Sequence, residues 1–153
     1  FQVLASSGLR LSEALSLRWE DIDWDTGMIL ANHSSQTKRS WVTFILPEAL
    51  EALKQLKDNG RPGPFPYYRG TAEEEFNEAA VKSGVKVTPQ TLREWFCNEM
   101  LRLEIPEVYI DAFCGRVPKT ILRRHYADLS PERLRQVYQE AVKRGFTLKD
   151  IIQ

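Results

Sequence analysis

Three short stretches in the first third of the chain have the apolar pattern of β-strands. Residues 19–24 alternate apolar and polar side chains, as a half-buried strand does, and residues 28–31 and 41–46 are two further strand-like runs. Asp25-Thr26-Gly27 supplies a turn between the first two. The simplest arrangement is a three-stranded antiparallel sheet, with Lys38 near the turn that joins its second and third strands.

The rest of the chain reads mainly as helices, several of which open with a proline or with a serine or threonine cap. Thr71 and Ser130 are the expected caps of two of them. The predicted helices span residues 11–17, 47–56, 72–83, 88–103, 106–113, 118–127 and 130–145. The first seven residues read as the end of a helix already under way, which suggests a piece of a longer chain. The predicted fold class is therefore α+β, mostly helical with one small sheet.

The composition is that of a soluble folded protein. With 153 residues, 42% hydrophobic and 27% charged, the chain has the size of one domain and can bury a core. No apolar run approaches the roughly 20 residues of a membrane helix, and no secretory signal opens the chain. Cys97 and Cys114 are too few for a disulfide framework, so we expect buried, reduced thiols in an intracellular protein. His33 and His125 are too few and too separated to form a metal site alone.

The charge is balanced overall but uneven along the chain. The 21 basic and 21 acidic residues cancel, which by itself argues against a nucleic-acid partner. Residues 116–144, however, hold eight Lys or Arg against three Asp or Glu, whereas residues 48–82 hold seven acids against five bases. A neutral chain can still present one basic face, so neutrality does not exclude DNA.

One tyrosine stands in this basic segment. Tyr126 follows Arg123, Arg124 and His125, and lies ten positions after Arg116. The plainer interpretation is a surface aromatic on a basic helix. Further basic residues in motifs along the chain favour another, in which Tyr126 is a nucleophile that attacks a DNA phosphodiester. His125 is assigned no catalytic role.

Four motifs resemble those of the tyrosine recombinases, or phage-type integrases, in order and over essentially the whole chain. They are Gly8-Leu9-Arg10-Leu11-Ser12-Glu13, Gln36-Thr37-Lys38-Arg39-Ser40, Thr88-Pro89-Gln90-Thr91-Leu92-Arg93 and Phe113-Cys114-Gly115-Arg116, with Tyr126 following. Each alone is weak, but four in register are strong. The last motifs are most similar to integrases of archaeal spindle-shaped viruses and related plasmids. The resemblance implies that residues 1–153 are a single catalytic domain whose parent carries an N-terminal DNA-binding domain absent here.

The resemblance also implies a role for each matched residue. The nucleophile would be Tyr126, the general acid Lys38 with Arg39 as the fallback, and the phosphate clamp Arg10, Arg93 and Arg116. Two positions depart from the family pattern, because Gln90 stands in place of a histidine or lysine and Arg116 in place of a histidine. An amide cannot exchange protons near neutral pH, so Gln90 can only orient the phosphate or the tyrosine.

Cleavage of a phosphodiester by a tyrosine requires residues of these types. Tyrosine attack on a phosphodiester passes through a negatively charged phosphorane, and arginine offers a permanent charge with forked donors that match phosphate oxygens. A lysine can supply the proton that the leaving 5′-oxygen needs. Nearby cations also favour the phenolate of a tyrosine, whose ordinary pKa is about 10. The product is a 3′-phosphotyrosine intermediate that conserves bond energy for rejoining, formed without a metal or another cofactor.

The predicted function is site-specific DNA recombination or integration by strand cleavage and rejoining. The expected partner is a double-stranded DNA attachment site, bound by a homotetramer in the host cytoplasm. The basic side chains expected to hold the DNA, largely through its phosphates, are Arg39, Lys119, Arg123 and Arg124.

Ordinary structural roles stay open for the candidates. Arg10 could pair with Glu13, and Arg93 with the glutamate that follows it, as surface contacts of little energetic weight. Arg116 could cap the preceding helix, and Lys38 could be a solvated turn lysine. Two other functions also stay open: DNA relaxation of the type IB topoisomerase kind, and a DNA-binding module that has lost turnover.

Overall fold

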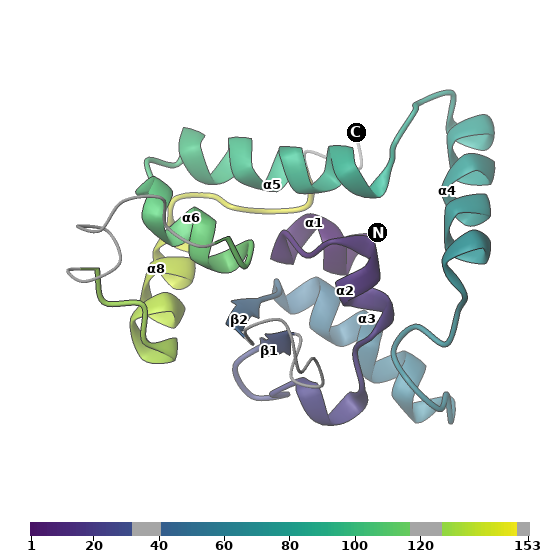
Figure 1. Cartoon of the computed structure of the whole chain (residues 1–153), viewed down its shortest axis with the longest axis horizontal. Coiled ribbons are helices and arrows are strands. Elements are labelled where there is room, and N and C mark those ends of the chain that lie inside the picture. The colour runs from purple at the N-terminus through teal and green to yellow at the C-terminus, as the bar shows by residue number, and fades with distance from the viewer. Residues whose placement is uncertain (32–40, 117–126, 150–153) are drawn as a thin grey trace.

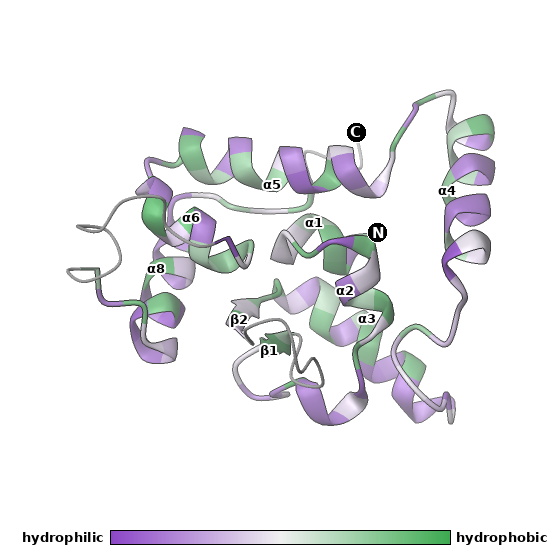
Figure 2. Ribbon diagram, in the orientation of Figure 1, coloured by the Kyte–Doolittle hydropathy of each residue, from purple (hydrophilic) through white to green (hydrophobic). Residues whose placement is uncertain are grey.

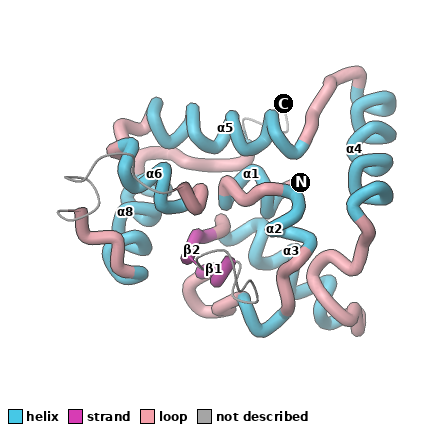
Figure 3. The backbone as a smooth tube through the Cα atoms, in the orientation of Figure 1, coloured by secondary structure: helices cyan, strands magenta, loops and turns pink. Residues whose placement is uncertain are grey.

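The computed structural model describes residues 1–31, 41–116 and 127–149. These form a mostly helical body around one small sheet, which confirms the predicted α+β class (Figures 1 and 3). The helices are α1 (Gln2–Ser7), α2 (Leu11–Leu15), α3 (Pro47–Asp58), α4 (Arg69–Ser83), α5 (Pro89–Arg102), α6 (Glu107–Phe113) and α8 (Pro131–Lys143). The helix predicted at 118–127 lies almost entirely outside the described residues.

The short helix α1 lies near the middle of this body. Helix α5 passes over it, α3 packs against it from the sheet side, and α6 and α8 pack against the sheet at one end of the molecule (Figure 1). Helix α4 stands at the opposite end and contacts α2. Figure 2 shows that α3, α5 and α8 each carry both hydrophilic and hydrophobic residues, as expected of helices with one face on a core.

The sheet has two strands in the described part of the chain. β1 (Met28–Ala31) pairs antiparallel with β2 (Trp41–Phe44), so that Met28 lies opposite Phe44 and Ala31 opposite Trp41. The hairpin predicted from the second and third apolar runs is therefore confirmed.

The first predicted strand, at residues 19–24, is wrong. Trp19–Asp21 form a 3₁₀ turn, and only Ile22 makes an isolated antiparallel bridge to Ile29 of β1. The turn is stabilised locally, because the Asp21 carboxylate accepts the backbone N–H of Arg18 at 2.7 Å. A distant partner adds to this, since the indole N–H of Trp19 donates to the Arg61 carbonyl at 2.8 Å. Apolar alternation alone could not reveal either contact.

The helix starts follow the predicted chemistry with one exception. α3, α5 and α8 each have proline in the first turn. The Thr88 hydroxyl accepts the backbone N–H of Thr91 at the start of α5, and Ser130 accepts that of Arg133 at the start of α8. The predicted cap Thr71 is wrong, because α4 already begins at Arg69 and Thr71 lies within its first turn.

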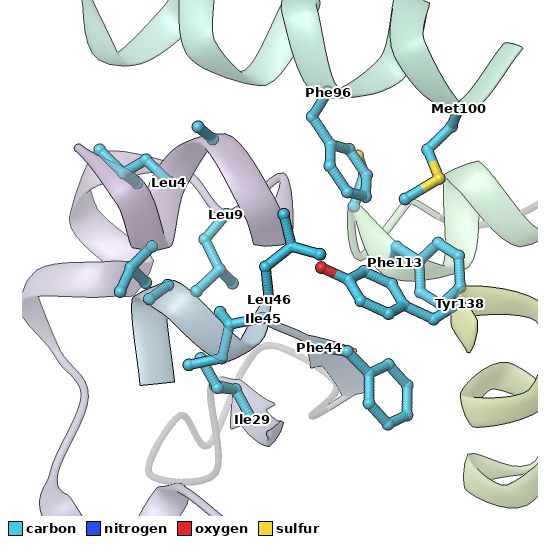
Figure 4. Packing of buried hydrophobic residues seen from close by; sticks show 14 of the residues in the cluster. Leu4, Leu9, Ile29, Phe44, Ile45, Leu46, Phe96, Met100, Phe113 and Tyr138 are labelled. Atoms are coloured by element: carbon cyan, nitrogen blue, oxygen red, sulfur yellow. The ribbon is translucent and has the colours of Figure 1, made fainter. Parts of the chain in front are cut away.

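An aromatic cluster fills the core between α5, α6, α8 and β2 (Figure 4). Phe44 and Phe113 meet edge to face, and so do Phe96 and Phe113. Tyr138 of α8 packs against both Phe44 and Phe113, with ring centroids 5.5 and 5.7 Å away. Such pairs add to the burial of large apolar surfaces, so this cluster joins the C-terminal helix to the sheet.

Two backbone carbonyls at the end of α1 are bound by side chains from distant elements. The buried Tyr138 hydroxyl donates to the Ser6 carbonyl at 2.7 Å, and the buried Thr43 hydroxyl of β2 donates to the Ser7 carbonyl at 2.7 Å. The last carbonyls of a helix have no intrahelical partner, so buried ones need such donors. The end of α1 is therefore a meeting point of α8 and β2.

We predict that Tyr138→Phe destabilises the protein, because it leaves the buried Ser6 carbonyl without its donor. The free energy of unfolding should fall by about 1–3 kcal/mol in urea titrations followed by circular dichroism. The matched control is Tyr67→Phe, because Tyr67 is 41% exposed and its hydroxyl accepts from Arg61 at the surface. It should change stability by less than about 0.5 kcal/mol. Equal effects of the two substitutions would contradict the role given to Tyr138.

Candidate functional site

Arg93 is one of the most buried charged side chains in the described structure. It lies on α5, and only 3% of its surface is exposed. Its guanidinium donates to two backbone carbonyls, those of Gly8 and Cys114, the second at 2.8 Å. The surface pairing with the following glutamate is not observed, since Glu94 instead accepts from Gln90. Arg93 therefore ties α5 to a segment 85 residues earlier and to another 21 residues later.

Glu13 supplies a negative charge beside this buried cation. Its carboxylate is 3% exposed and lies 3.8 Å from Arg93 Nη1. The same carboxylate accepts the Arg10 guanidinium at 2.8 Å and the Arg10 backbone N–H at 2.7 Å. The predicted alternative of an Arg10–Glu13 pair is thus observed. Because Glu13 is buried and shared, however, it is not a plain surface contact: it holds Arg10 beside Arg93.

Arg10 and Arg93 line the same cleft, which has a volume of about 300 Å³. The cleft is formed by the N-terminal ends of α2, α4 and α5, and is lined by Arg10, Leu11, Ser12, Arg69, Glu73, Thr88, Pro89, Gln90 and Arg93. About half of the Arg10 side chain is exposed there. Burial lowers the pKa of the Arg93 guanidinium, and the charges of Arg10 and Arg116 lower it further. An arginine stays protonated under such shifts, so the cleft carries positive charge.

Arg116 approaches the same cluster from α6. The N–H of Arg116 closes the end of α6 by donating to the Asp111 carbonyl at 2.8 Å, as the predicted capping role requires. Its side chain, 46% exposed, pairs with the Asp111 carboxylate at 3.3 Å and points a second nitrogen at the sulfur of Cys97. The backbone caps a helix while the guanidinium is oriented toward α5, so the structural and functional interpretations are compatible.

Two glycines make this close assembly possible. Gly8 has φ of 67°, and an added Cβ would lie 2.6 Å from the ring of Phe96. Gly115 has φ of 62°, and an added Cβ would lie 2.4 Å from the ring of Trp41. A side chain at either position is excluded both by the backbone conformation and by the neighbouring ring. The segments that carry Arg10 and Arg116 therefore fit against the core only with glycine before them.

Gln90 is one of the residues that line the cleft, and its amide donates to Glu94 at 2.8 Å. Sequence reasoning missed the part that four other residues play in this region. The sequence indicates Glu13 only as a surface partner of Arg10, assigns no role to Arg69, and predicts Cys97 and Cys114 only as buried, reduced thiols. The distance of three residues between Arg10 and Glu13 was the one available signal, because partners from other elements leave no trace in a single sequence.

Six predicted site residues lie outside the described residues: Lys38, Arg39, Lys119, Arg123, Arg124 and Tyr126. Tyr138 is a poor substitute for Tyr126 as nucleophile, because its hydroxyl is buried and already bound to Ser6. Within the described ranges, no three His, Cys, Asp or Glu side chains gather closely enough to hold a metal ion. None of the described helices combines the length and the apolar character needed to cross a membrane.

Residues 1–133 match the model of the Phage integrase family. Among curated proteins, the chain is 30% identical over 112 residues to tyrosine recombinase XerC of Xanthomonas axonopodis pv. citri, covering 65% of this chain and 36% of that protein. It is 24% identical over 161 residues to tyrosine recombinase XerA of Pyrococcus furiosus, covering 98% of this chain and 54% of that protein. The chain thus spans about a third to a half of these relatives.

Solved structures show the same fold. The crystal structure of XerA recombinase superposes with a TM-score of 0.70 at 24% identity, over 91% of this chain and 55% of that one. The Tn1549 transposon integrase in complex with circular intermediate DNA gives 0.66 at 16% identity, over 90% of this chain and 57% of that one. At this identity the likeness concerns the fold alone.

We predict that Glu13→Ala destabilises the protein by about 3–5 kcal/mol, because it leaves the buried Arg93 charge without its counter-charge. Urea unfolding measures this loss. Glu73→Ala is the matched control. Glu73 pairs with Arg69 at 2.8 Å, the distance of the Glu13–Arg10 pair, but both side chains of this pair are exposed on α4. That exposed pair should contribute less than about 1 kcal/mol. A loss for Glu13→Ala no larger than for Glu73→Ala would show that Glu13 is only a surface partner of Arg10.

Proposed function

The chain belongs to the phage integrase family, and from this premise we propose that it recombines DNA at a specific site by cleaving and rejoining strands. The observation that carries the proposal is that Arg10 and Arg116 lie near the buried guanidinium of Arg93. Three neighbouring guanidinium charges repel one another, so such a cluster favours the binding of an anion. A phosphodiester at the attack step carries the negative charge that such a cluster would stabilise.

We assign the three arginines different roles according to how exposed their side chains are. Arg10 and Arg116 are about half exposed and would donate to the non-bridging oxygens of the phosphate. Arg93 is fixed by two carbonyls, which use two of the five N–H donors of a guanidinium. It would hold the two flanking segments at the distance that the phosphate requires and add its own charge to the site. Loss of one donor of this kind typically costs roughly 3–4 kcal/mol of transition-state stabilisation.

The remaining roles fall to residues beyond the described ranges. Tyr126 would attack the phosphorus through its hydroxyl oxygen and become linked to the DNA 3′-phosphate, as the 5′-oxygen leaves. Lys38, with Arg39 as the fallback, would give the proton to that 5′-oxygen. Gln90, which lines the cleft, would orient the phosphate or the tyrosine. No step in this scheme is assigned to a metal.

The substrate would be a double-stranded DNA attachment site, bound by a homotetramer inside the host cell. Phosphate contacts would come from the basic residues Arg39, Lys119, Arg123 and Arg124. The Tn1549 transposon integrase, of similar fold, has been observed with DNA, which supports this partner. We also infer an affinity to integrases of archaeal spindle-shaped viruses and related plasmids, supported by the archaeal relative in Pyrococcus furiosus. Relatives named as recombinases and integrases favour recombination over a topoisomerase-like activity.

We predict that Tyr126→Phe abolishes covalent capture of DNA while leaving DNA affinity unchanged, because only the hydroxyl is nucleophilic. The assay incubates the protein with a nicked suicide duplex and looks for a protein–DNA adduct on a denaturing gel, with affinity measured by fluorescence anisotropy. Tyr68→Phe, at a tyrosine that is 89% exposed, is the matched control and should capture DNA normally. Capture should persist in excess EDTA. An adduct formed by Tyr126→Phe, or a strict need for Mg²⁺, would contradict this mechanism.

A second prediction concerns the general acid. If Lys38 protonates the 5′-oxygen, Lys38→Ala should cleave normal DNA about a hundred- to ten-thousandfold more slowly. It should be nearly as fast as the unmodified protein on a strand with sulfur at the bridging 5′ position, because a thiolate leaves without a proton. Arg93→Ala is the control, and the sulfur strand should not rescue it. Rescue of Arg39→Ala instead of Lys38→Ala would reassign the acid to Arg39, and rescue of neither would place the acid elsewhere.

A further inference from the structure

Two cysteine thiols lie in contact with each other, next to Arg93 and Arg116. Cys97 is on α5, one helical turn after Arg93, and Cys114 is the residue that ends α6. Their sulfur atoms are 3.6 Å apart, and both cysteines are free. Cys114 is fully buried, whereas Cys97 is partly open to solvent. A small oxidant can therefore reach one sulfur, and the other is already within contact distance of it.

The surroundings favour a thiolate on Cys97. The hydrogen bond with the Cys114 thiol lowers the pKa of Cys97 to about 6, and the charges of Arg116 and Arg93 contribute to the same shift. Arg116 Nη2 lies 3.8 Å from the Cys97 sulfur. The same hydrogen bond and its burial raise the pKa of Cys114. Both shifts favour a thiolate on Cys97, the more exposed of the two residues, over one on Cys114, and the thiolate is the reactive form of a cysteine.

We propose that Cys97 and Cys114 are a redox-active pair that hydrogen peroxide converts to a disulfide, and that this modification weakens the neighbouring arginine site. The Cys97 thiolate attacks one peroxide oxygen, giving a sulfenic acid and, after protonation, one water. The Cys114 sulfur then attacks the Cys97 sulfur, forming the S–S bond and releasing the sulfenic oxygen as a second water. Two electrons pass from the two thiols to the peroxide, and a dithiol reductant reverses the change.

The disulfide would act on the site through Cys114. A disulfide bond is about 2.05 Å long, so the sulfur atoms would have to approach by about 1.5 Å. The carbonyl of Cys114 is one of the two that Arg93 binds, and the Cys114 sulfur packs against Gly8, whose carbonyl is the other. Gly115, the next residue, has no space to move toward Trp41. The displacement would therefore fall on Arg93 and α5, while Arg116 would lose the anion that faces it.

The first test measures the thiols and does not depend on DNA. Labelling of Cys97 with iodoacetamide should speed up as the pH rises, with the midpoint near the pKa of about 6 and a plateau roughly one pH unit higher, because only the thiolate reacts. Limited peroxide should then remove both free thiols, lower the mass of the monomer by two hydrogen atoms, and be reversed by dithiothreitol. Cys97→Ser is the matched control and should form no internal disulfide. Over-oxidation of Cys97 with the Cys114 thiol still free would overturn the redox pair.

The second test measures DNA capture and rests on the proposed function. Oxidation should reduce the rate of adduct formation by about a hundredfold, the cost of a displacement of about 1 Å in an active site. Dithiothreitol should restore the rate, and the ratio of treated to untreated rates should stay near one for Cys97→Ser. A disulfide that leaves DNA capture unchanged would contradict the proposed effect of oxidation on the arginine site. A protein that forms the disulfide but never captures DNA would instead contradict the proposed function and leave the redox pair standing.

Discussion

Three consecutive carbonyls at the end of α1 join this central helix to α8, β2 and α5. The Ser6 carbonyl is bound by Tyr138 from α8, the Ser7 carbonyl by Thr43 from β2, and the Gly8 carbonyl by Arg93 from α5. All three donors are buried side chains. A helix end placed inside a core must have its carbonyls satisfied, and here the donors come from three different parts of the chain. Side chains from three distant parts of the chain therefore hold the end of α1 in place.

This constraint also places the candidate site. Arg10 follows the last of these carbonyls by two residues, so its backbone position depends on the same network. Arg93 belongs both to the network of carbonyls and to the candidate site. It binds the Gly8 carbonyl on one side and the Cys114 carbonyl, two residues before Arg116, on the other. A buried guanidinium would be costly without compensation, and the two carbonyls and the Glu13 carboxylate supply it. Stability and chemistry are thus coupled at one side chain.

The parts that the sequence predicts well are those governed by local rules. Pro47, Pro89 and Pro131 mark helix starts because proline suits a first turn, and the hairpin of β1 and β2 follows from two apolar runs. The failures have other causes. The turn at Trp19 depends on a capping carboxylate, Asp21, and on a distant carbonyl, that of Arg61, and apolar alternation reports neither. Helix α4 begins before Thr71 without any side-chain cap, because a cap is only one of several ways to start a helix.

The candidate site shows the same division. The motifs place Arg10, Arg93 and Arg116 in order along the chain, and the structure brings these three together. Their differing roles were not predictable, because burial and carbonyl partners arise only on folding. Arg93 was expected to act on the phosphate like the other two, but it is also the anchor of the site. Glu13 and the Cys97–Cys114 pair have their significance only from residues packed against them.

The most direct test of this account replaces Arg93 with lysine and measures the single-turnover rate of strand cleavage. Lysine keeps the positive charge but cannot donate to both carbonyls in the forked geometry of a guanidinium. If Arg93 acts as the anchor, Arg93→Lys should lose about a hundredfold or more in rate, nearly as much as Arg93→Ala. A lysine variant that cleaves within about threefold of the unmodified protein would show that charge alone matters at this position, and would contradict the account.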